Sequence, residues 1–417
     1  MSNIPLGVDV EKIGAGRMKH AAKDVRPLGI TRPSVEPRAL YISPIDMQAD
    51  NGMARRQEQL LNALCMIYPD SVDLLSLSAS YAKSSAWLRK KGLKVNLLRG
   101  IFPAAARWNA TLWYGGGVIL CNKLRWISRF YFPLRTPLPA SWLRRYDLIL
   151  CFYPWFHRLL GLERGGKKVI VDTGDIMADR HERTGARRWI SMTAKDERAV
   201  LESDCRSLAI SQDDSDEFRR LYGIQLPVVP FVPPDYMELI GIARYERPPK
   251  VGFMGAPSYV NEEILRTLSE PDFLECLSSH GVELLIAGGI CQTASPSVLA
   301  ALERGGARIL GRIPSIVDYY RQIRVTVNPV GPSTGVKIKS VETLLAGCSL
   351  ITTRWGADRL LAGAFPGYVT YIDWPIESRR LGDACVAAIR RANPDGTEVA
   401  KKYVQSTVQT LKAMLSI

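Results

Sequence analysis

The hydrophobic residues of this chain fall into short apolar runs that alternate with helix-like segments. "ALYIS" (residues 39–43) reads as a buried strand, and "MARRQEQLLNALCMIY" (residues 53–68) has the apolar spacing of an amphipathic helix. Further strand-like runs follow at "VDLLSL", "LKVNLL", "DLILCFY", "KKVIVD" and "RSLAIS". Short apolar strands separated by helices predict a parallel sheet covered on both faces, and therefore an α/β fold.

The same rhythm begins again after a proline-rich joint. "LPVVPFVPPDY" holds four prolines between residues 227 and 234, which suits a stiff connection better than the interior of an element. Beyond it, "KVGFMGA", "VELLIAGG", "ARILGR", "VTVNPV", "SLITT" and "YVTYI" read as strands. Helices are predicted at 262–268, 297–304, 316–322, 336–346 and 379–392.

Two similar α/β domains therefore follow each other in the chain. Its 417 residues exceed what one hydrophobic core usually supports. We divide it into a mobile tail (1–36), a first doubly wound domain (37–234), a second one (235–395) and a last helix (396–417), whose pattern permits packing back against the first domain. Two such domains facing each other leave a cleft at the carboxyl ends of both sheets, where open α/β sheets bind ligands.

The net charge of +14 is concentrated in one block. Between residues 74 and 146 there is no acidic residue, and thirteen lysines and arginines are interleaved with tryptophan, tyrosine and phenylalanine. Cations beside indoles suit an anionic lipid surface, so we expect peripheral contact with a membrane. A solvated basic face and a nucleic-acid surface are the alternatives. We expect no nucleic acid, because no recognised binding module accompanies the charge.

The cysteines and the apolar runs indicate the compartment. Eight cysteines are scattered without a Cys-x-x-Cys spacing, which argues against a disulfide framework or a zinc site. No apolar run approaches the roughly 20 residues of a membrane helix, and residues 1–36 lack a signal-like apolar core. We expect a cytoplasmic protein that is peripheral on the inner face of the cell membrane.

The candidate chemistry lies in "NPVGPSTGVKIKSVETLLAGCSLITT", residues 328–353. A strand, a turn and a helix follow one another here, so that Gly335 lies at the N-terminus of the helix. Its missing Cβ, the unpaired N–H groups of the helix start, and Lys337 and Lys339 favour a phosphate or diphosphate. Glu342 can accept hydrogen bonds from a ribose diol. Phosphate and ribose together describe a nucleotide, although a plain Lys339–Glu342 surface pair is the alternative.

The same residues resemble a known family. "NPVGPSTGVKIKSVETLLAGCSLITTRWGADRL" resembles the donor-site segment of the GT-B retaining glycosyltransferases called family 4 or group 1. "KVGFMGAPSYVNEEIL", "VELLIAGG" and "ARILGRIPSIVDYYRQIRVTVNPV" resemble preceding segments of that domain in the same order, and "YISPIDMQADNGMARRQEQLLNAL" is similar to the opening strand and glycine loop of the family. The resemblance implies two facing Rossmann-like domains and transfer of a sugar, with retention, from a nucleotide-sugar donor to a glycan or lipid-linked acceptor.

Site residues are carried over from the resemblance position by position. It implies that Gly335, Val336 and Lys337 meet the donor diphosphate and that Glu342 meets the ribose. Gly311 and Arg312 would lie beside the base, Gly52 close to the phosphates from the first domain, and Gly255 in the first loop of the second domain. No metal or other cofactor is expected, because the helix dipole, the backbone N–H groups and Lys337 already face the charge that develops on the leaving group.

Two departures from the family pattern bear on catalysis. Thr334 occupies the place of a frequent second acid, and Gly174 occupies the place of a histidine in "DTGD". For a base or acceptor-positioning group we name Asp175, with Asp172 behind it; His157 and His181 have no recognisable carboxylate partner. The alternatives are a GT-B nucleotide-binding or scaffold protein without turnover, and an epimerase of nucleotide sugars. The nucleotide, the sugar and the acceptor are not readable from the sequence.

Overall fold

The computed structural model describes residues 37–43, 52–77, 81–98, 137–178, 192–391 and 395–416. All of these residues belong to one compact unit, Pro37–Ile417. The predicted tail, residues 1–36, lies outside the described residues, as does most of the acid-free block.

A parallel sheet of six strands forms the first half of this unit. Its strand order is β3-β2-β1-β4-β5-β6, and the chain crosses over between β3 and β4 to place β4 beside β1. The strands are β1 Ala39–Ser43, β2 Val72–Ser76, β3 Val95–Leu97, β4 Leu148–Phe152, β5 Val169–Asp172 and β6 Arg206–Leu208. Each coincides with an apolar run that predicted a strand.

The second sheet repeats this order. Its strands run β12-β11-β10-β7-β8-β9, so that β7 and β10 are neighbours in the middle. They are β7 Lys250–Met254, β8 Glu283–Ala287, β9 Arg308–Gly311, β10 Val325–Asn328, β11 Ser349–Thr352 and β12 Val369–Tyr371. Counted within each half, both sheets have the order 3-2-1-4-5-6 of doubly wound dinucleotide-binding folds. The predicted α/β fold with two doubly wound domains is confirmed.

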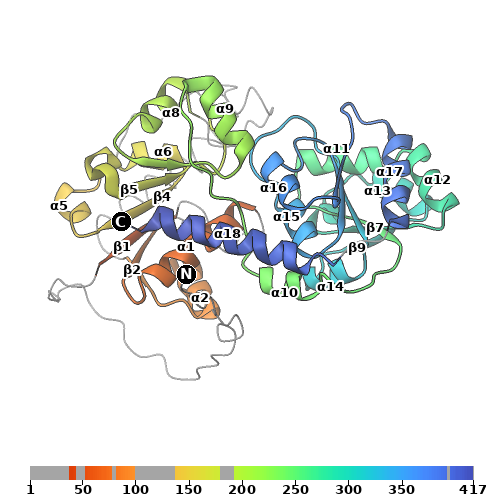
Figure 1. Cartoon of the computed structure of the whole chain (residues 1–417), viewed down its shortest axis with the longest axis horizontal. Helices are drawn as coiled ribbons and strands as arrows, with labels where there is room; N and C mark the ends of the chain where they lie inside the picture. Colours follow the sequence, from red (N-terminus) through yellow and green to blue (C-terminus); the bar gives the residue numbers. More distant parts are fainter. Residues whose placement is uncertain are drawn as a thin grey trace, which may run out of the picture. The chain divides into compact units, whose positions relative to one another are not determined.

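Helices connect the strands and cover both faces of each sheet (Figure 1). In the first half they are α1 Gly52–Ile67, α2 Tyr81–Lys91, α5 Ala140–Leu143, α6 Pro154–Leu159, η3 Leu162–Lys168, α8 Ala194–Leu201 and α9 Gln212–Tyr222. From the joint onward they are α10 Tyr236–Gly241, α11 Tyr259–Leu268, α12 Pro271–Ser279, η4 Gly289–Gln292, α13 Pro296–Arg304, α14 Ile316–Arg321, α15 Ile338–Leu345, α16 Arg359–Ala364, α17 Ser378–Arg390 and α18 Thr397–Leu415.

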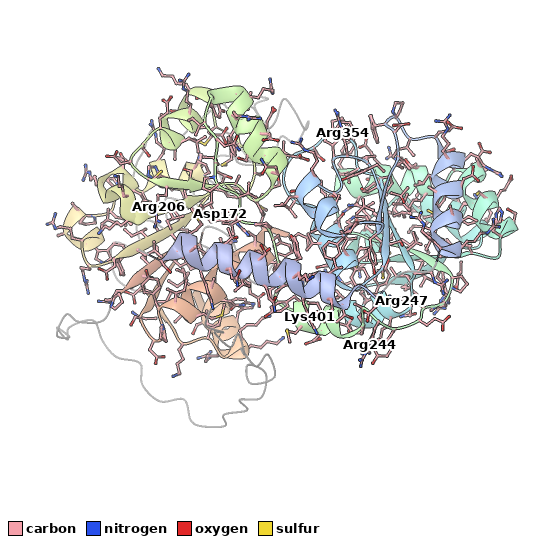
Figure 2. The ribbon with its side chains drawn as sticks, in the orientation of Figure 1. Asp172, Arg206, Arg244, Arg247, Arg354 and Lys401 are labelled. Atoms are coloured by element: carbon pink, nitrogen blue, oxygen red, sulfur yellow. The ribbon has the colours of Figure 1, made fainter. Side chains whose placement is uncertain are left out.

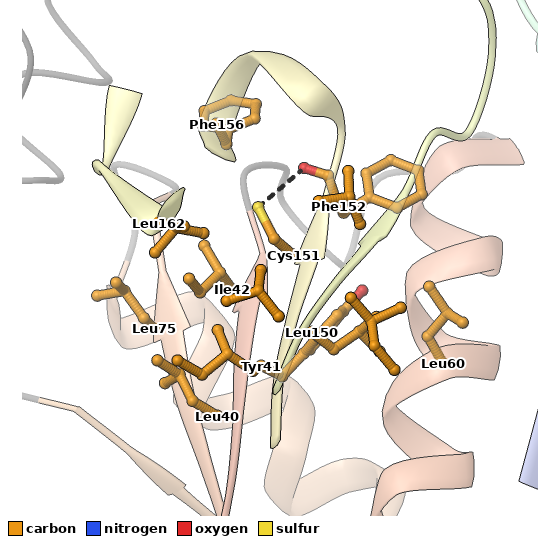
Figure 3. Close-up of a cluster of buried hydrophobic side chains, with 14 of the residues drawn as sticks. Leu40, Tyr41, Ile42, Leu60, Leu75, Leu150, Cys151, Phe152, Phe156 and Leu162 are labelled. Carbon is orange, nitrogen blue, oxygen red and sulfur yellow. Dashed lines mark hydrogen bonds between the residues drawn. The ribbon is translucent and has the colours of Figure 1, made fainter. Parts of the chain in front are cut away.

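The central strands are buried on both faces. Every residue of β1 and β4 is buried, which explains why these strands read as continuous apolar runs without alternation. Figure 3 shows Leu40, Tyr41 and Ile42 of β1 packed beside Leu150 of β4 and Leu60 of α1. This packing holds β1 and β4 in the middle of the sheet, and the loops of the site leave from the carboxyl ends of its strands.

The last helix, α18, packs against both halves. Leu411 and Leu415 belong to the core of the first half, whereas Ala400, Tyr403 and Val404 belong to a core cluster of the second. The Tyr68 hydroxyl donates to the carbonyl of Leu415 at 3.3 Å. In Figure 1 the helix runs from the second sheet to the first.

Helix α15 is held at both ends. Near its start, the Asn328 amide donates to Ser340 Oγ at 2.9 Å. At its end, the buried guanidinium of Arg247 donates to the carbonyls of Ala346 and Gly347, where a cation complements the negative end of the helix dipole. The helix begins at Ile338 rather than at the predicted residue 336, so that Gly335, Val336 and Lys337 precede it.

Candidate active site

The candidate site lies at the switch point of the second sheet. Gly255 follows β7 and Gly335 follows β10, and these two strands are neighbours whose connections leave in opposite directions along the sheet. Ligands of open α/β sheets bind in the crevice formed there. Gly311 ends β9, two strands beyond β7, and Arg312 follows it. The structure therefore places Gly255, Gly311, Arg312 and Gly335 at one edge of this sheet, at the carboxyl ends of its strands.

Gly335 forms the turn that leads into α15. Its φ of 75° lies in the left-handed region that favours glycine. Lys337 occupies the N-cap position of α15, and its ammonium group donates to the carbonyls of Thr334 at 2.8 Å and Gly335 at 2.9 Å. Lys337 thus rigidifies the turn and places a positive charge beside the start of the helix.

Two carboxylates from the first half meet this turn. The N–H of Gly335 donates to Asp214 Oδ1 at 3.1 Å, and the hydroxyl of Thr334 donates to Asp175 Oδ1. Asp175 lies in the loop after β5, and Asp214 lies in the first turn of α9, after β6. The Gly335 N–H, which the sequence analysis left open for a diphosphate, is therefore engaged by a protein carboxylate.

Burial and like charge perturb Asp214. Burial in the protein, followed by the charge of Asp175, raises the pKa of Asp214 to about 7. Hydrogen bonds from the Ser211 hydroxyl at 2.7 Å and from Gly335 act in the opposite direction, because both stabilise the carboxylate. Two carboxylates close to one N–H group form a local excess of negative charge that a proton can relieve.

Glu342 is buried one turn into α15. Its Oε1 accepts from Arg55 at 2.8 Å and its Oε2 accepts from the Tyr320 hydroxyl at 3.3 Å. Burial raises the pKa of Glu342 to about 7, and the charge of Arg55 opposes this shift. The alternative of a Lys339–Glu342 surface pair is wrong, because the ammonium of Lys339 donates instead to Asn261 at 2.8 Å.

Helix α1 brings a second group of residues to the same place. Gly52 is its first residue, and a Cβ added there would lie 3.0 Å from the Cδ1 of Ile338, at the start of α15. Arg55, one turn later, bridges Glu342 and Asp235. The start of α1 thus lies directly against the start of α15.

The "DTGD" loop leaves no room for a histidine at its glycine. A Cβ added to Gly174 would lie 2.8 Å from the Tyr153 ring and 2.9 Å from the Phe152 ring, and the φ of Gly174 is 62°. Asp172, labelled in Figure 2, is completely buried and pairs with Arg56 of α1 at 2.6 Å. Its role is structural, whereas Asp175 reaches Thr334. His157 is buried in α6, and His181 lies outside the described residues.

A cavity of about 710 Å³ opens beside the Gly335 turn. Its walls come from the loops after β6, β10 and β11, with residues of α9, the proline-rich joint and α18. Of the predicted donor residues, Thr334, Gly335, Val336 and Lys337 line this cavity, whereas Gly52, Gly255, Gly311, Arg312 and Glu342 do not. The guanidinium of Arg354, labelled in Figure 2, stacks on the Trp355 ring at 4.4 Å in its wall. Its other charged residues are Asp213, Asp214, Glu217, Lys337, Asp358 and Arg359. A polar ligand next to the turn would be enclosed by these groups.

The described part of the chain contains neither a metal-binding cluster nor a membrane-spanning helix. The described ranges hold no group of three or more histidine, cysteine, aspartate or glutamate residues able to bind a metal ion. They also hold no helix long and apolar enough to cross a bilayer.

Three residues of the site were not predicted from the sequence. Asp214, Arg55 and Tyr320 reach the Gly335 turn or Glu342 from three different elements. Asp214 and Arg55 do carry a weak signal, since one follows the end of a strand and the other lies one turn after Gly52. Tyr320 gives none, because a tyrosine within a short helix is more often part of the core.

Comparisons with known proteins agree with this fold. Residues 248–375 match the family model described as "Glycosyl transferases group 1". No curated protein matches the chain. Among solved structures, HepE of Anabaena in complex with UDP and glucose has a TM-score of 0.56 at 13% identity, over 91% of this chain and 97% of that one.

Two further structures are similar over comparable lengths. A glycosyltransferase from Rickettsia africae has a TM-score of 0.57 at 13% identity, covering 91% of this chain and 94% of its own. WaaG, a glycosyltransferase involved in lipopolysaccharide biosynthesis, has a TM-score of 0.52 at 13% identity, covering 92% and 100%. These likenesses show the shared two-sheet GT-B fold.

Proposed function

We propose that this protein, whose residues 248–375 match the model of the group 1 glycosyltransferases, transfers a sugar from a nucleoside diphosphate donor to a glycan or lipid-linked acceptor. The observation that carries the proposal is the convergence on the start of α15. Gly335, Lys337 and Glu342 lie there within a segment that matches the family model, and Gly52 and Asp175 reach it from the other sheet.

Each group of the site has a part in this reaction. The diphosphate lies against the N–H groups at the start of α15 and against Lys337, so that the charge on the departing nucleoside diphosphate is stabilised without proton transfer. Glu342 accepts the ribose hydroxyls after sharing or releasing its bond from Arg55. Gly255, Gly311 and Arg312 border the base. We assign no metal or other cofactor to the reaction.

Asp175 is the residue we place nearest the reacting sugar. Its carboxylate touches Thr334 and lies 3.6 Å from the point where a Cβ of Gly335 would be. From that position it orients the acceptor hydroxyl, which attacks the anomeric carbon on the side that the leaving group vacates. The acceptor oxygen gives its proton to the Asp175 carboxylate as the new glycosidic bond forms and the bond to the diphosphate breaks. Attack from that side retains the anomeric configuration.

Titration calorimetry with a panel of nucleotide sugars tests the proposal. UDP-sugars come first, since HepE of Anabaena was solved with UDP and glucose. We expect one of the panel to bind and the nucleoside diphosphate to be released slowly by hydrolysis. Binding without any release would favour the nucleotide-binding protein without turnover, and the absence of binding across the panel would refute the donor site.

We also propose that the basic first half holds the protein against an anionic membrane, where a lipid-linked acceptor would be found. Arg89, Lys90, Arg144 and Arg145 are exposed, and the described residues give them no acidic partner. Lys91 and Lys94 pair with Glu58 and Asp70. The contact would be peripheral and driven by charge.

A further inference from the structure

We propose that Asp214 competes with the donor diphosphate for the N–H of Gly335, so that the donor binds by displacing this carboxylate. The inference rests on the proposed donor site and adds to it a residue that sets the affinity. The reason is that two anions, the Asp214 carboxylate and the diphosphate, would accept a hydrogen bond from the same N–H group. The Gly335 N–H donates to Asp214 Oδ1 at 3.1 Å, and Gly335 lies in the turn that leads into α15, two residues before its N-cap Lys337. A diphosphate bound at the start of α15 would lie beside this N–H group.

The Asp214 carboxylate can give up its hydrogen bond with Gly335 and still keep another hydrogen bond. Its second oxygen accepts from the Ser211 hydroxyl at 2.7 Å, and Ser211 caps the helix that carries Asp214. That bond persists when Oδ1 leaves Gly335. Asp214 also lines the cavity, so that its carboxylate can turn into that space without disturbing the core of the sheet.

The charged groups around Asp214 set the pH at which displacement is easiest. Asp175 repels it from the loop after β5, and Lys337 attracts it from the start of α15. The remaining charged residues of the cavity wall are Asp213, Glu217, Arg354, Asp358 and Arg359. A diphosphate arriving beside two carboxylates adds like charge, which favours the protonated form of Asp214.

Donor binding is therefore linked to uptake of a proton. The pKa of Asp214 is about 7 before the donor arrives, and the diphosphate raises it further. Affinity is then highest below pH 7 and falls as the pH rises above it, by roughly tenfold per pH unit until the raised pKa is reached. The diphosphate diester of a nucleotide sugar does not titrate in this range, so the dependence belongs to the protein.

Calorimetry between about pH 6.5 and pH 8.5 tests this, with UDP-glucose, ADP-glucose, GDP-mannose and dTDP-glucose as probes. For whichever probe binds, we expect wild-type affinity to weaken by roughly 10- to 30-fold across the range. Asp214→Asn keeps the shape of the side chain and removes its charge. Its affinity should fall less steeply with pH than that of wild type, because only the titration of Glu342 and Lys339 remains in this range, and it should be tighter than that of wild type at the alkaline end. Asp204→Asn, an exposed change before β6, should behave as wild type.

The outcomes separate this inference from the proposed function. If a probe binds wild type with the same affinity at every pH, or if Asp214→Asn binds more weakly than wild type at high pH, Asp214 does not compete and the inference is wrong while the donor site stands. If no probe binds either protein at any pH, the donor site itself is refuted. If Asp214→Asn does not fold, Ser211→Ala tests the same point. It removes a hydrogen bond that lowers the pKa of Asp214, so the fall in affinity should move to higher pH, and an unmoved profile would overturn the inference.

Discussion

Burial of the Glu342 carboxyl group lowers the stability of the folded protein at neutral pH, although the group is placed to bind a ribose in the proposed function. Its pKa in the folded protein, about 7, lies above the ordinary value of 4.5, because burial outweighs the charge of Arg55. The folded state therefore binds the proton more tightly than the unfolded state. Its stability falls as the pH rises from the ordinary pKa to the raised one, and above pH 7 the full destabilisation is present.

We expect Glu342→Gln to be more stable than wild type at about pH 8, by on the order of 1–3 kcal/mol, because the amide is buried without a charge. Arg55 keeps Asp235 as its partner. The same change should weaken nucleotide-sugar binding roughly 10- to 100-fold, since the ribose loses a charged acceptor. Urea denaturation and calorimetry measure the two effects. Glu303→Gln, an exposed site on α13, should change neither.

The sequence could predict the residues of the Gly335 turn, but not the residues of other elements that contact them. Gly335, Lys337 and Glu342 are consecutive features of one strand–turn–helix segment, and local patterns describe such segments well. Asp214 contacts the turn and Arg55 contacts Glu342, both from the first half of the chain. Asp214 and Gly335 are 121 residues apart, so their contact leaves no local pattern in the sequence. Likewise, the tight packing of Tyr153 and Phe152 against Gly174 depends on a side-chain arrangement that no spacing records.

Helix α15 depends on a cation at its far end. Arg247 is buried and donates at 2.9 Å to the carbonyl of Tyr320, at 2.6 Å to that of Ile242, and to the last carbonyls of α15. Four carbonyl groups are thereby satisfied by one side chain. Because the start of this helix carries the proposed diphosphate site, Arg247 supports the site from the opposite end.

Arg247→Met should therefore destabilise the protein by about 2–4 kcal/mol, since it leaves buried carbonyl groups without a donor. We expect the loss in chemical denaturation, together with weaker nucleotide-sugar binding as the helix loosens. Arg244→Met is the matched control, because Arg244 lies three residues away and is exposed (Figure 2). A loss of similar size in both variants would contradict a special role for Arg247.

Strands were predicted more completely than helices. All twelve strands of the described part of the chain coincide with apolar runs, because a strand buried on both faces needs such a run. Helices α10, α12 and α16 were not predicted. Only two residues, Ser269 and Glu270, separate helix α12 from α11, so the two read as one segment. Helices α10 and α16 have six residues each, which gives a helical period little length to show, although α14 of the same length was predicted.

In the proposed function, the second half of the chain binds the donor and the first half contacts the membrane. The second half matches the glycosyltransferase family and carries the α15 turn, while the first carries the acid-free block. Helix α18 contributes buried side chains to the cores of both halves. A membrane contact made by the first half would thus hold the second half, and its donor site, near the bilayer.

We expect the protein to float with vesicles rich in anionic lipid at low salt and to be released at high salt, because the attraction is screened. Each cation near the headgroups contributes about 1 kcal/mol. Arg89→Gln with Lys90→Gln should therefore weaken the vesicle affinity by roughly 30-fold. Arg379→Gln with Arg380→Gln, an exposed pair on α17 outside the acid-free block, should leave it unchanged. Equal losses in both double variants would mean that net charge, rather than this block, attracts the membrane, and no flotation of wild type at low salt would refute the membrane contact.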